Sequence, residues 1–172
     1  SLDIVTPNDT LPEKADAVVV GGGIIGVMTA LELSERGLLV AVVEKGEIAG
    51  EQSSRNWGWV RQQGRDPAEL PIMIESIRIW KSLAQEMGPG LGFQQTGVLY
   101  QAQDEAAMAE YEAWLPHARA HDLDTRLLTG DEVAALMPQA AQRWVGGLWT
   151  PSDAKAEPWV AVPMLAGAAA GR

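Results

Sequence analysis

Apolar and polar positions along the first part of this chain follow a strand, turn, helix, strand order. Residues 16–20 end in a run of valines, of the kind found in strands that are buried on both faces. A glycine-rich turn follows, and apolar side chains then recur at helical spacing as far as Gly37. A second apolar run, residues 38–43, ends at Glu44. We therefore expect two parallel strands joined by a helix, the opening of a doubly wound α/β fold.

The glycine turn and the acid that ends the second strand have the spacing of a dinucleotide site. Gly21 permits a tight turn, Gly23 lets the backbone approach a pyrophosphate, and Gly26 lets the helix lie close to the sheet. Free N–H groups and the positive end of the dipole at the helix start favour phosphate. Glu44, 18 residues after Gly26, can accept hydrogen bonds from ribose hydroxyls. A glycine-rich surface turn, the alternative, gives no reason for the helix and acid that follow. The pattern predicts a Rossmann-like domain.

The later segments predict a second, smaller region that mixes helices and short strands. The expected elements are a helix from Asp66 to Gly88, two antiparallel strands around Thr96-Gly97, a helix over 104–120, a strand over 125–128, a capped helix over 129–136, a strand over 144–150, an irregular return over 151–158 and a helix over 163–170. We expect a nucleotide-binding domain over residues 1–90, a second domain over 91–150 and a return to the first domain over 151–172.

Composition excludes several classes of function. The chain has 13 basic and 23 acidic residues, a net charge of −10 and no basic stripe, so we expect no nucleic-acid partner. It has no cysteine, which excludes disulfides, a thiolate nucleophile and cysteine-ligated zinc. No apolar run has the length of a membrane span, and we expect a cytoplasmic protein. His117 and His121 have metal-ligand spacing, but Pro116 interrupts their helix and no HExxH glutamate is present, so no metal site is expected.

Two stretches of the chain resemble a known family. Residues 17–44 resemble the FAD-binding entry of the D-amino-acid oxidase-like (DAO) family, which includes glycine and sarcosine oxidases and amino-acid dehydrogenases. Residues 49–58 resemble the family's second flavin loop, where a serine, an asparagine and a glycine follow the acid. Weaker similarity extends to Pro158. The resemblance implies an α/β fold in which a sheet-rich α+β substrate domain is inserted into a Rossmann-like FAD-binding domain, incomplete in this chain.

The resemblance also implies a set of site residues. FAD is expected to bind without a covalent bond, because the stretch after Glu44 offers no His or Cys. The expected cofactor-binding residues are Gly21, Gly23, Ile24, Ile25, Gly26, Glu44, Lys45, Gln52, Ser53, Ser54, Arg55, Asn56, Trp57 and Gly58.

The residues just after this loop are possible substrate contacts. Trp57 and Trp59 could pack on the cofactor, wall the substrate pocket, or serve ordinary packing. Arg61 is expected to hold a substrate carboxylate, because a guanidinium fork matches two carboxylate oxygens. In the alternative, Arg61 is a surface residue or pairs with Asp66 or Glu69. Catalytic residues are left unassigned.

The activity implied by the resemblance is oxidation of the C–N bond of an amino acid or related amine to an imine, with hydride transfer to FAD. Three alternatives stay open: flavin-dependent oxidation of a 2-hydroxy acid or glycerol phosphate, a non-catalytic nucleotide-binding subunit of a heteromer, and an NAD-dependent enzyme. An NAD-dependent enzyme would leave the loop around Ser53 without a role. At 172 residues the chain is expected to be a fragment, inactive alone, whose fold is completed by the rest of the polypeptide or by a second chain.

Overall fold

The computed structural model describes residue 8 and residues 10–172. The chain forms two compact units. Of the described residues, unit 1 comprises 8, 10–59, 83–93 and 156–172, and unit 2 comprises 60–82 and 94–155. These units are defined by packing, whereas the domains expected from the sequence are defined by what they bind. The expected boundaries at 90/91 and 150/151 therefore stay predictions.

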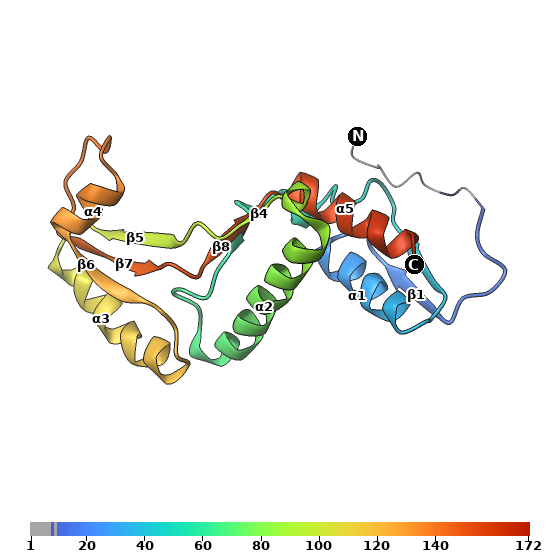
Figure 1. Cartoon of the computed structure of the whole chain (residues 1–172), viewed down its shortest axis with the longest axis horizontal. Helices are drawn as coiled ribbons and strands as arrows, with labels where there is room; N and C mark the ends of the chain where they lie inside the picture. Colours follow the sequence, from blue (N-terminus) through green and yellow to red (C-terminus); the bar gives the residue numbers. More distant parts are fainter. Residues whose placement is uncertain (1–7, 9) are drawn as a thin grey trace. The chain divides into compact units, whose positions relative to one another are not determined.

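Unit 1 contains the strand–helix–strand element expected from the sequence. Strands β1 (Ala17–Val20) and β2 (Val40–Val43) pair in parallel, in register from Ala17 opposite Val40 to Val20 opposite Val43. Helix α1 (Ile24–Glu35) connects them and packs on both strands, and α5 (Pro158–Ala170) packs along α1 (Figure 1). The buried core of the two helices consists of Val27, Ala30, Leu31, Ala161, Val162, Leu165 and Ala166. The expected strand–helix–strand element that opens the α/β fold is confirmed.

The end of α1 follows from local sequence. Gly37 has a φ of 80°, and its N–H donates to Ser34 O at 2.9 Å. Leu38 N–H donates to Leu33 O at 3.2 Å. These two bonds form a Schellman motif, which needs a left-handed residue after the helix and so favours glycine there. The expected helix end at Gly37 is confirmed.

One face of β1 differs from the expectation of burial on both sides. The side chains of Val18 and Val20 are 62% and 83% exposed. Helix α1 packs on the sheet, but among the described residues nothing buries these two valines. The apolar run thus marks a strand correctly, while burial of its second face is not seen in this part of the protein.

Unit 2 is built on an antiparallel sheet of order β5-β7-β6. Its strands are β5 (Val98–Ala102), β6 (Arg126–Thr129) and β7 (Gly146–Thr150), and α3 (Glu105–Ala120) and α4 (Gly130–Leu136) contact it. Thr129 and Glu132 form the capping box expected at the start of α4. Helix α2 (Leu70–Met87) follows the short 3₁₀ turn Pro67–Glu69 and contributes residues to both units.

Three expectations about the strands and the last helix were wrong. The residues around Thr96-Gly97 do not form a hairpin, because β4 (Phe93–Gln94) and β5 belong to different sheets. β4 lies in a sheet of order β3-β8-β4, with β3 (Trp59–Val60) and β8 (Ala154–Ala156). β8 falls in the segment expected to be irregular. Helix α5 begins at Pro158, which takes the first-turn position, so Pro163 lies inside the helix.

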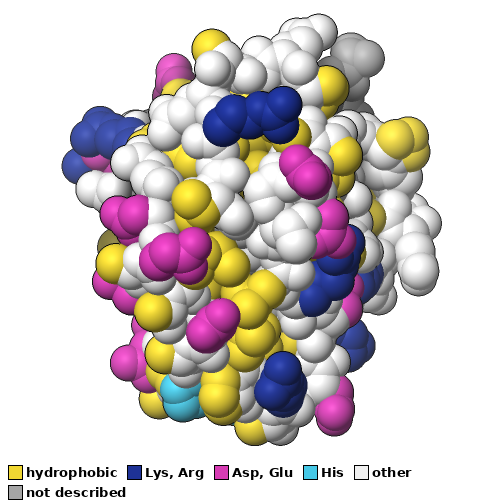
Figure 2. Space-filling view, turned by 90° about the vertical axis from the view of Figure 1, so that its left-hand side faces the viewer, with side chains coloured by type: hydrophobic (Ala, Val, Ile, Leu, Met, Phe, Trp, Pro, Cys, Tyr) yellow, Lys and Arg dark blue, Asp and Glu magenta, His cyan; other side chains and the backbone are white. Residues whose placement is uncertain are grey.

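The surface carries charges of both signs. Figure 2 shows acidic and basic side chains scattered over one face, with hydrophobic side chains between them and no concentration of Lys and Arg. None of the helices in the described part of the chain has the length and apolarity needed to cross a membrane. The cytoplasmic location stays a prediction.

Candidate functional site

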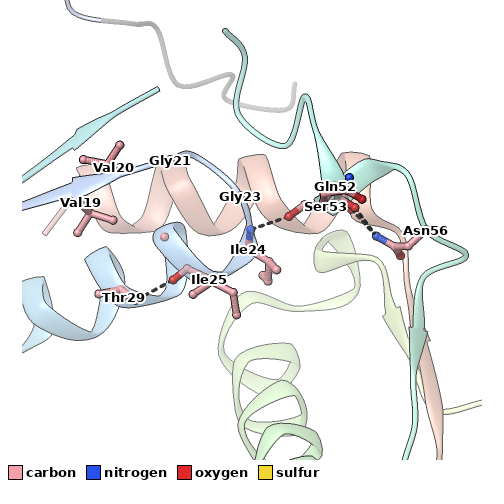
Figure 3. Close-up of a pocket in the computed structure, with 11 residues that line it drawn as sticks. Val19, Val20, Gly21, Gly23, Ile24, Ile25, Thr29, Gln52, Ser53 and Asn56 are labelled. Atoms are coloured by element: carbon pink, nitrogen blue, oxygen red, sulfur yellow. Dashed lines mark hydrogen bonds between the residues drawn. The ribbon is translucent and has the colours of Figure 1, made fainter. Parts of the chain in front are cut away.

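An open groove of about 520 Å³ lies where β1 ends and α1 begins, entirely within unit 1 (Figure 3). Ligands of open α/β sheets bind at this end of the strands. The glycine turn forms one part of the lining, and the loop after Glu44 forms the other. The lining residues are Val19, Val20, Gly21, Gly23, Ile24, Ile25, Gly26, Thr29, Gln52, Ser53 and Asn56.

The glycines of the turn are required for different physical reasons. Gly21 has a φ of 108°, a conformation that side chains disfavour, and a Cβ added there would meet no atom within 4 Å. A Cβ on Gly26 would lie 2.0 Å from the Gly21 carbonyl oxygen. Gly23 is the N-cap residue of α1, and a Cβ there would lie 3.0 Å from Ser53 Oγ. The turn therefore leaves open space where a Gly21 side chain would lie, and it packs tightly where the Gly21 carbonyl oxygen meets Gly26.

The start of α1 is suited to an anion. Its first turn contains no acidic residue, and Gly23 supplies no side-chain cap. Ile24 N–H donates to Ser53 Oγ at 2.8 Å, a bond visible in Figure 3. The remaining N–H groups of the first turn and the positive end of the helix dipole meet the groove without a competing acidic side chain in that turn.

Glu44 stabilises the turn and lies outside the groove lining. Its Oε2 accepts a hydrogen bond from Gly22 N at 2.6 Å, and its Oε1 accepts one from Gly46 N at 2.9 Å. The Gly22 bond, followed by the Gly46 bond, lowers the pKa of the Glu44 carboxyl below its usual range. The carboxylate is thus negatively charged at neutral pH. A carboxylate oxygen has a second lone pair, so each can still accept a hydroxyl.

The loop after Glu44 is attached to the glycine turn by its backbone. Ala49 is buried, has a φ of 64°, and donates its N–H to Gly22 O at 3.0 Å. Lys45 and Arg55 both pair with Glu51, at 3.0 and 2.9 Å. Lys45 first and then Arg55 lower the pKa of Glu51. Lys45 and Arg55 therefore both pair with a carboxylate of their own loop. These ion pairs give the two residues a structural role.

The end of this loop is closed by Asn56. Its Nδ2 donates to Ser53 O at 2.8 Å and to Gln52 O at 3.1 Å, and its Oδ1 accepts from Gly58 N at 2.7 Å. Gly58 has a φ of 71°, and an added Cβ would lie 2.2 Å from Ala156 O. Gly58 is therefore required by its backbone conformation and its packing.

The aromatic pair beside Gly58 is open to solvent. Trp57 and Trp59 form an edge-to-face pair with ring centroids 5.5 Å apart, and Trp57 is 84% exposed. Edge-to-face contact is a favourable arrangement of two aromatic rings. An exposed face of this size can pack on a ligand, so a role at the cofactor or the substrate stays a prediction.

The structure gathers about half of the predicted cofactor residues around the groove. Those that line it are Gly21, Gly23, Ile24, Ile25, Gly26, Gln52, Ser53 and Asn56. Those outside its lining are Glu44, Lys45, Ser54, Arg55, Trp57 and Gly58. Sequence reasoning missed Val19, Val20 and Thr29. Thr29 follows Gly26 by three positions and Ile25 by four, so helical spacing could have placed it on the same face.

Arg61 lies in unit 2, in a polar segment with its own contacts. Its guanidinium carbon is 5.8 Å from the centroid of the Tyr100 ring, and its Nη1 donates to Gln63 O. Asp66 accepts from Ala68 N at 2.8 Å, and Glu69 pairs with Arg65 at 3.5 Å. The two acids considered as local partners of Arg61 thus have other partners. Its role at a substrate stays a prediction.

The two histidines do not join a larger set of metal-binding side chains. His117 lies in the last turn of α3, and His121 is the C-cap residue. Within the described residues, no group of three or more His, Cys, Asp or Glu side chains could hold a metal ion.

A family model described as "FAD dependent oxidoreductase" (DAO) matches residues 16–172. Human mitochondrial sarcosine dehydrogenase is 27% identical over 169 residues, which are 96% of this chain and 18% of that protein. L-amino acid deaminase from Proteus myxofaciens, solved with anthranilate, superimposes with a TM-score of 0.89 at 29% identity, covering 95% of this chain and 38% of that one.

A second similar structure was solved with the cofactor bound. L-alpha-glycerophosphate oxidase from Mycoplasma pneumoniae, solved with FAD bound, has a TM-score of 0.82 and 28% identity, covering 93% of this chain and 43% of that one. The chain therefore spans less than half the length of each of these relatives.

Proposed function

Because the chain belongs to the FAD dependent oxidoreductase (DAO) family, we propose that the protein oxidises the C–N bond of an amino acid or related amine to an imine. FAD is the cofactor, and when bound it supplies the acceptor for the substrate hydride. Similarity to a sarcosine dehydrogenase and an L-amino acid deaminase supports the substrate class. Since the chain covers a minority of these proteins, the activity belongs to the complete protein.

The observation that carries the proposal is the joint lining of the groove by the glycine turn and the second loop. Ser53 connects them through its bond with Ile24 N–H. An NAD-dependent Rossmann site needs the turn but gives this loop no task. A loop that lines the same groove as the turn fits a larger dinucleotide such as FAD.

Each part of the site has an assigned task in this proposal. The N–H groups at the start of α1 bind the pyrophosphate, and the missing Cβ of Gly23 allows its close approach. Glu44 accepts from the ribose hydroxyls while it holds Gly22 N. Gln52, Ser53 and Asn56 reach the pyrophosphate or the isoalloxazine, and the exposed Trp57 covers an apolar part of the cofactor. Arg61 binds the substrate carboxylate.

FAD is held without a covalent bond in this proposal. Covalent flavin attachment uses a nucleophilic side chain such as His or Cys, and this chain contains no cysteine. Its two histidines lie in α3 or at its end, and neither lines the groove. After denaturation and proteolysis of the complete protein, peptides from residues 1–172 should therefore carry no flavin.

A visible spectrum of the purified complete protein tests the function. We expect oxidised flavin bands that bleach anaerobically when an amino acid from a broad panel is added. Bleaching only by 2-hydroxy acids or by glycerol phosphate would favour the second candidate, which the similarity to a glycerophosphate oxidase supports. Flavin bands that no substrate bleaches would indicate a non-catalytic nucleotide-binding subunit.

The fold would be completed by the rest of the same polypeptide or by a second chain.

A further inference from the structure

A buried carboxylate in unit 2 holds the backbone next to Arg61. Asp153 has 0% exposure. Its Oδ1 accepts from Gln62 N at 2.7 Å and from Gln62 Nε2 at 3.1 Å, and its Oδ2 accepts from Gln63 N at 3.0 Å. Burial raises the pKa of Asp153, while the Gln62 and Gln63 donors act in the opposite direction. Three hydrogen bonds compensate a carboxylate that is costly to bury.

Gln63 is fixed at a second point by a chain of hydroxyls. Thr150, also fully buried, donates its hydroxyl to Gln63 Oε1 at 2.7 Å. Thr125 Oγ1 lies 2.7 Å from Thr150 Oγ1. Because the Thr150 proton is used on Gln63, Thr125 must donate to Thr150. The main chain and the side chain of Gln63 are thus both held by residues in or beside β7.

Arg61 is joined to this fixed segment. Its Nη1 donates to the carbonyl oxygen of Gln63, and its guanidinium lies over the Tyr100 ring. Gly64, the residue after Gln63, has a φ of 65°, and a Cβ there would lie 2.8 Å from Tyr100 Cε2. The backbone that follows Gln63 is thus closely packed on the same ring. A shift of Gln63 would therefore move the atom that orients the guanidinium.

We propose that Asp153 is a positioning residue, which fixes Gln62 and Gln63 and through them sets the orientation of the Arg61 guanidinium toward the carboxylate of the substrate. The inference rests on the proposed function and adds to it a residue 92 positions away from Arg61 in sequence. A purely structural role would stabilise the fold of unit 2 equally for every ligand. A positioning role affects ligands that carry a carboxylate and spares those that lack it.

The first test uses Asp153→Asn in the complete, FAD-loaded protein. One carboxylate oxygen becomes an NH₂ donor that faces a backbone N–H, so the segment loses part of its support. Binding of anthranilate, an aromatic carboxylate, is followed by the change in flavin absorbance, and binding of aniline, which lacks the carboxylate, is measured alongside. We expect the dissociation constant of anthranilate to rise about tenfold and that of aniline to stay unchanged.

A double-mutant cycle tests the route of the effect. If Asp153 acts through Arg61, Asp153→Asn should weaken anthranilate binding in the wild-type background and have no further effect in Arg61→Met. Full additivity of the two losses would overturn the proposal. Thr150→Val keeps the shape of the side chain and removes its hydroxyl bonds to Gln63 and Thr125. Thr150→Val should weaken anthranilate binding less than Asp153→Asn does and leave aniline binding unchanged. It replaces Asp153→Asn as the test if that variant does not fold.

Asp104→Asn is the matched control. Asp104 is an exposed acid that caps α3 by accepting from Ala107 N at 2.9 Å, and an asparagine oxygen can still accept that bond. We expect wild-type binding of both ligands. Equal weakening of anthranilate and aniline in Asp153→Asn, or wild-type anthranilate binding in both Asp153→Asn and Thr150→Val, would contradict the proposal. If wild-type flavin is not reduced by any amino acid, the proposed function fails instead, so the two failures are distinct.

Discussion

The Ser53 hydroxyl oxygen accepts a hydrogen bond from the Ile24 backbone N–H at 2.8 Å, although the two residues are 29 positions apart. Ile24 is the first residue of α1, where backbone donors have no partner within the helix. Ser53 therefore acts as a side-chain cap supplied by a distant loop. The bond brings this loop to the glycine turn and gives the groove its second wall.

Ser53→Ala should weaken FAD binding. The substitution leaves Ile24 N–H without its acceptor and removes a polar group from the groove. A hydrogen bond of this kind contributes about 0.5–1.5 kcal/mol, so the dissociation constant of FAD should rise roughly two- to thirteenfold. Titration of the apoprotein with FAD, followed by flavin fluorescence, measures this. Ser34→Ala is the control, because the Ser34 hydroxyl donates to Ala30 O within α1 and lies outside the lining. Equal effects of both substitutions would contradict the prediction.

Gly23→Val should yield protein without flavin. A Cβ at Gly23 would be 3.0 Å from Ser53 Oγ, and the two methyl groups of valine would extend further into the space assigned to pyrophosphate. The flavin-to-protein ratio after purification is the measurement, with thermal unfolding to show that the protein is folded. A folded Gly23→Val protein with full flavin content would refute the assignment.

Gly26→Ala should destabilise the fold of unit 1 itself. The added Cβ would lie 2.0 Å from a backbone oxygen, that of Gly21, which cannot move away without shifting β1 or α1. Overpacking of this kind costs about 1–3 kcal/mol or more. Chemical denaturation of the apoprotein measures the loss. Gly90→Ala is the matched control, since its nearest new contact is the flexible end of Met164 at 3.6 Å. A Gly26→Ala protein as stable as Gly90→Ala would show that the turn can relax.

The contribution of Glu44 to stability should depend on pH. Hydrogen bonds from Gly22 and Gly46 lower the pKa of the folded carboxyl from its ordinary value of 4.5. A lowered pKa means that the contribution is fully present above 4.5 and is lost as pH falls through the lowered value. The stability difference between wild type and Glu44→Gln should therefore be largest near neutral pH and vanish in acid. Glu47→Gln, in the same loop, is the control. A difference that does not change with pH would exclude this linkage.

Arg61→Met should raise KM for the best amino acid of the complete enzyme. The substitution keeps much of the aliphatic stem and removes the charge and the guanidinium donors, at a cost of about 1.5–3 kcal/mol of carboxylate binding. Steady-state kinetics with the amino acid and with its decarboxylated amine measure the effect. Arg78→Met, which removes an exposed arginine paired with Glu75, should behave as wild type. An unchanged KM in Arg61→Met would leave Arg61 a structural role only.

Sequence reasoning succeeded where the determining contacts are local. The turn at Gly21, the helix end at Gly37 and the capping box of Thr129 with Glu132 depend on residues within a few positions, and each forms as expected. The predicted hairpin around Gly97 failed for the opposite reason. Gly97 N–H donates to Asp153 O, and β4 and β5 each pair with a strand from the later part of the chain. A turn signal alone could not show those partners.

The sequence by itself determined the parallel strand–helix–strand entry, its glycine positions and the family of the chain, because backbone conformation and helix capping follow from neighbouring side chains. Tertiary structure alone decided which of the polar loop residues face the groove. It also decided that Asp153, unmarked by any motif, lies buried against Gln62 and Gln63. Contacts across 29 or 91 positions depend on where whole elements pack. No local pattern of residue types encodes that placement, since burial energy is non-directional and many pairings satisfy the same local rules.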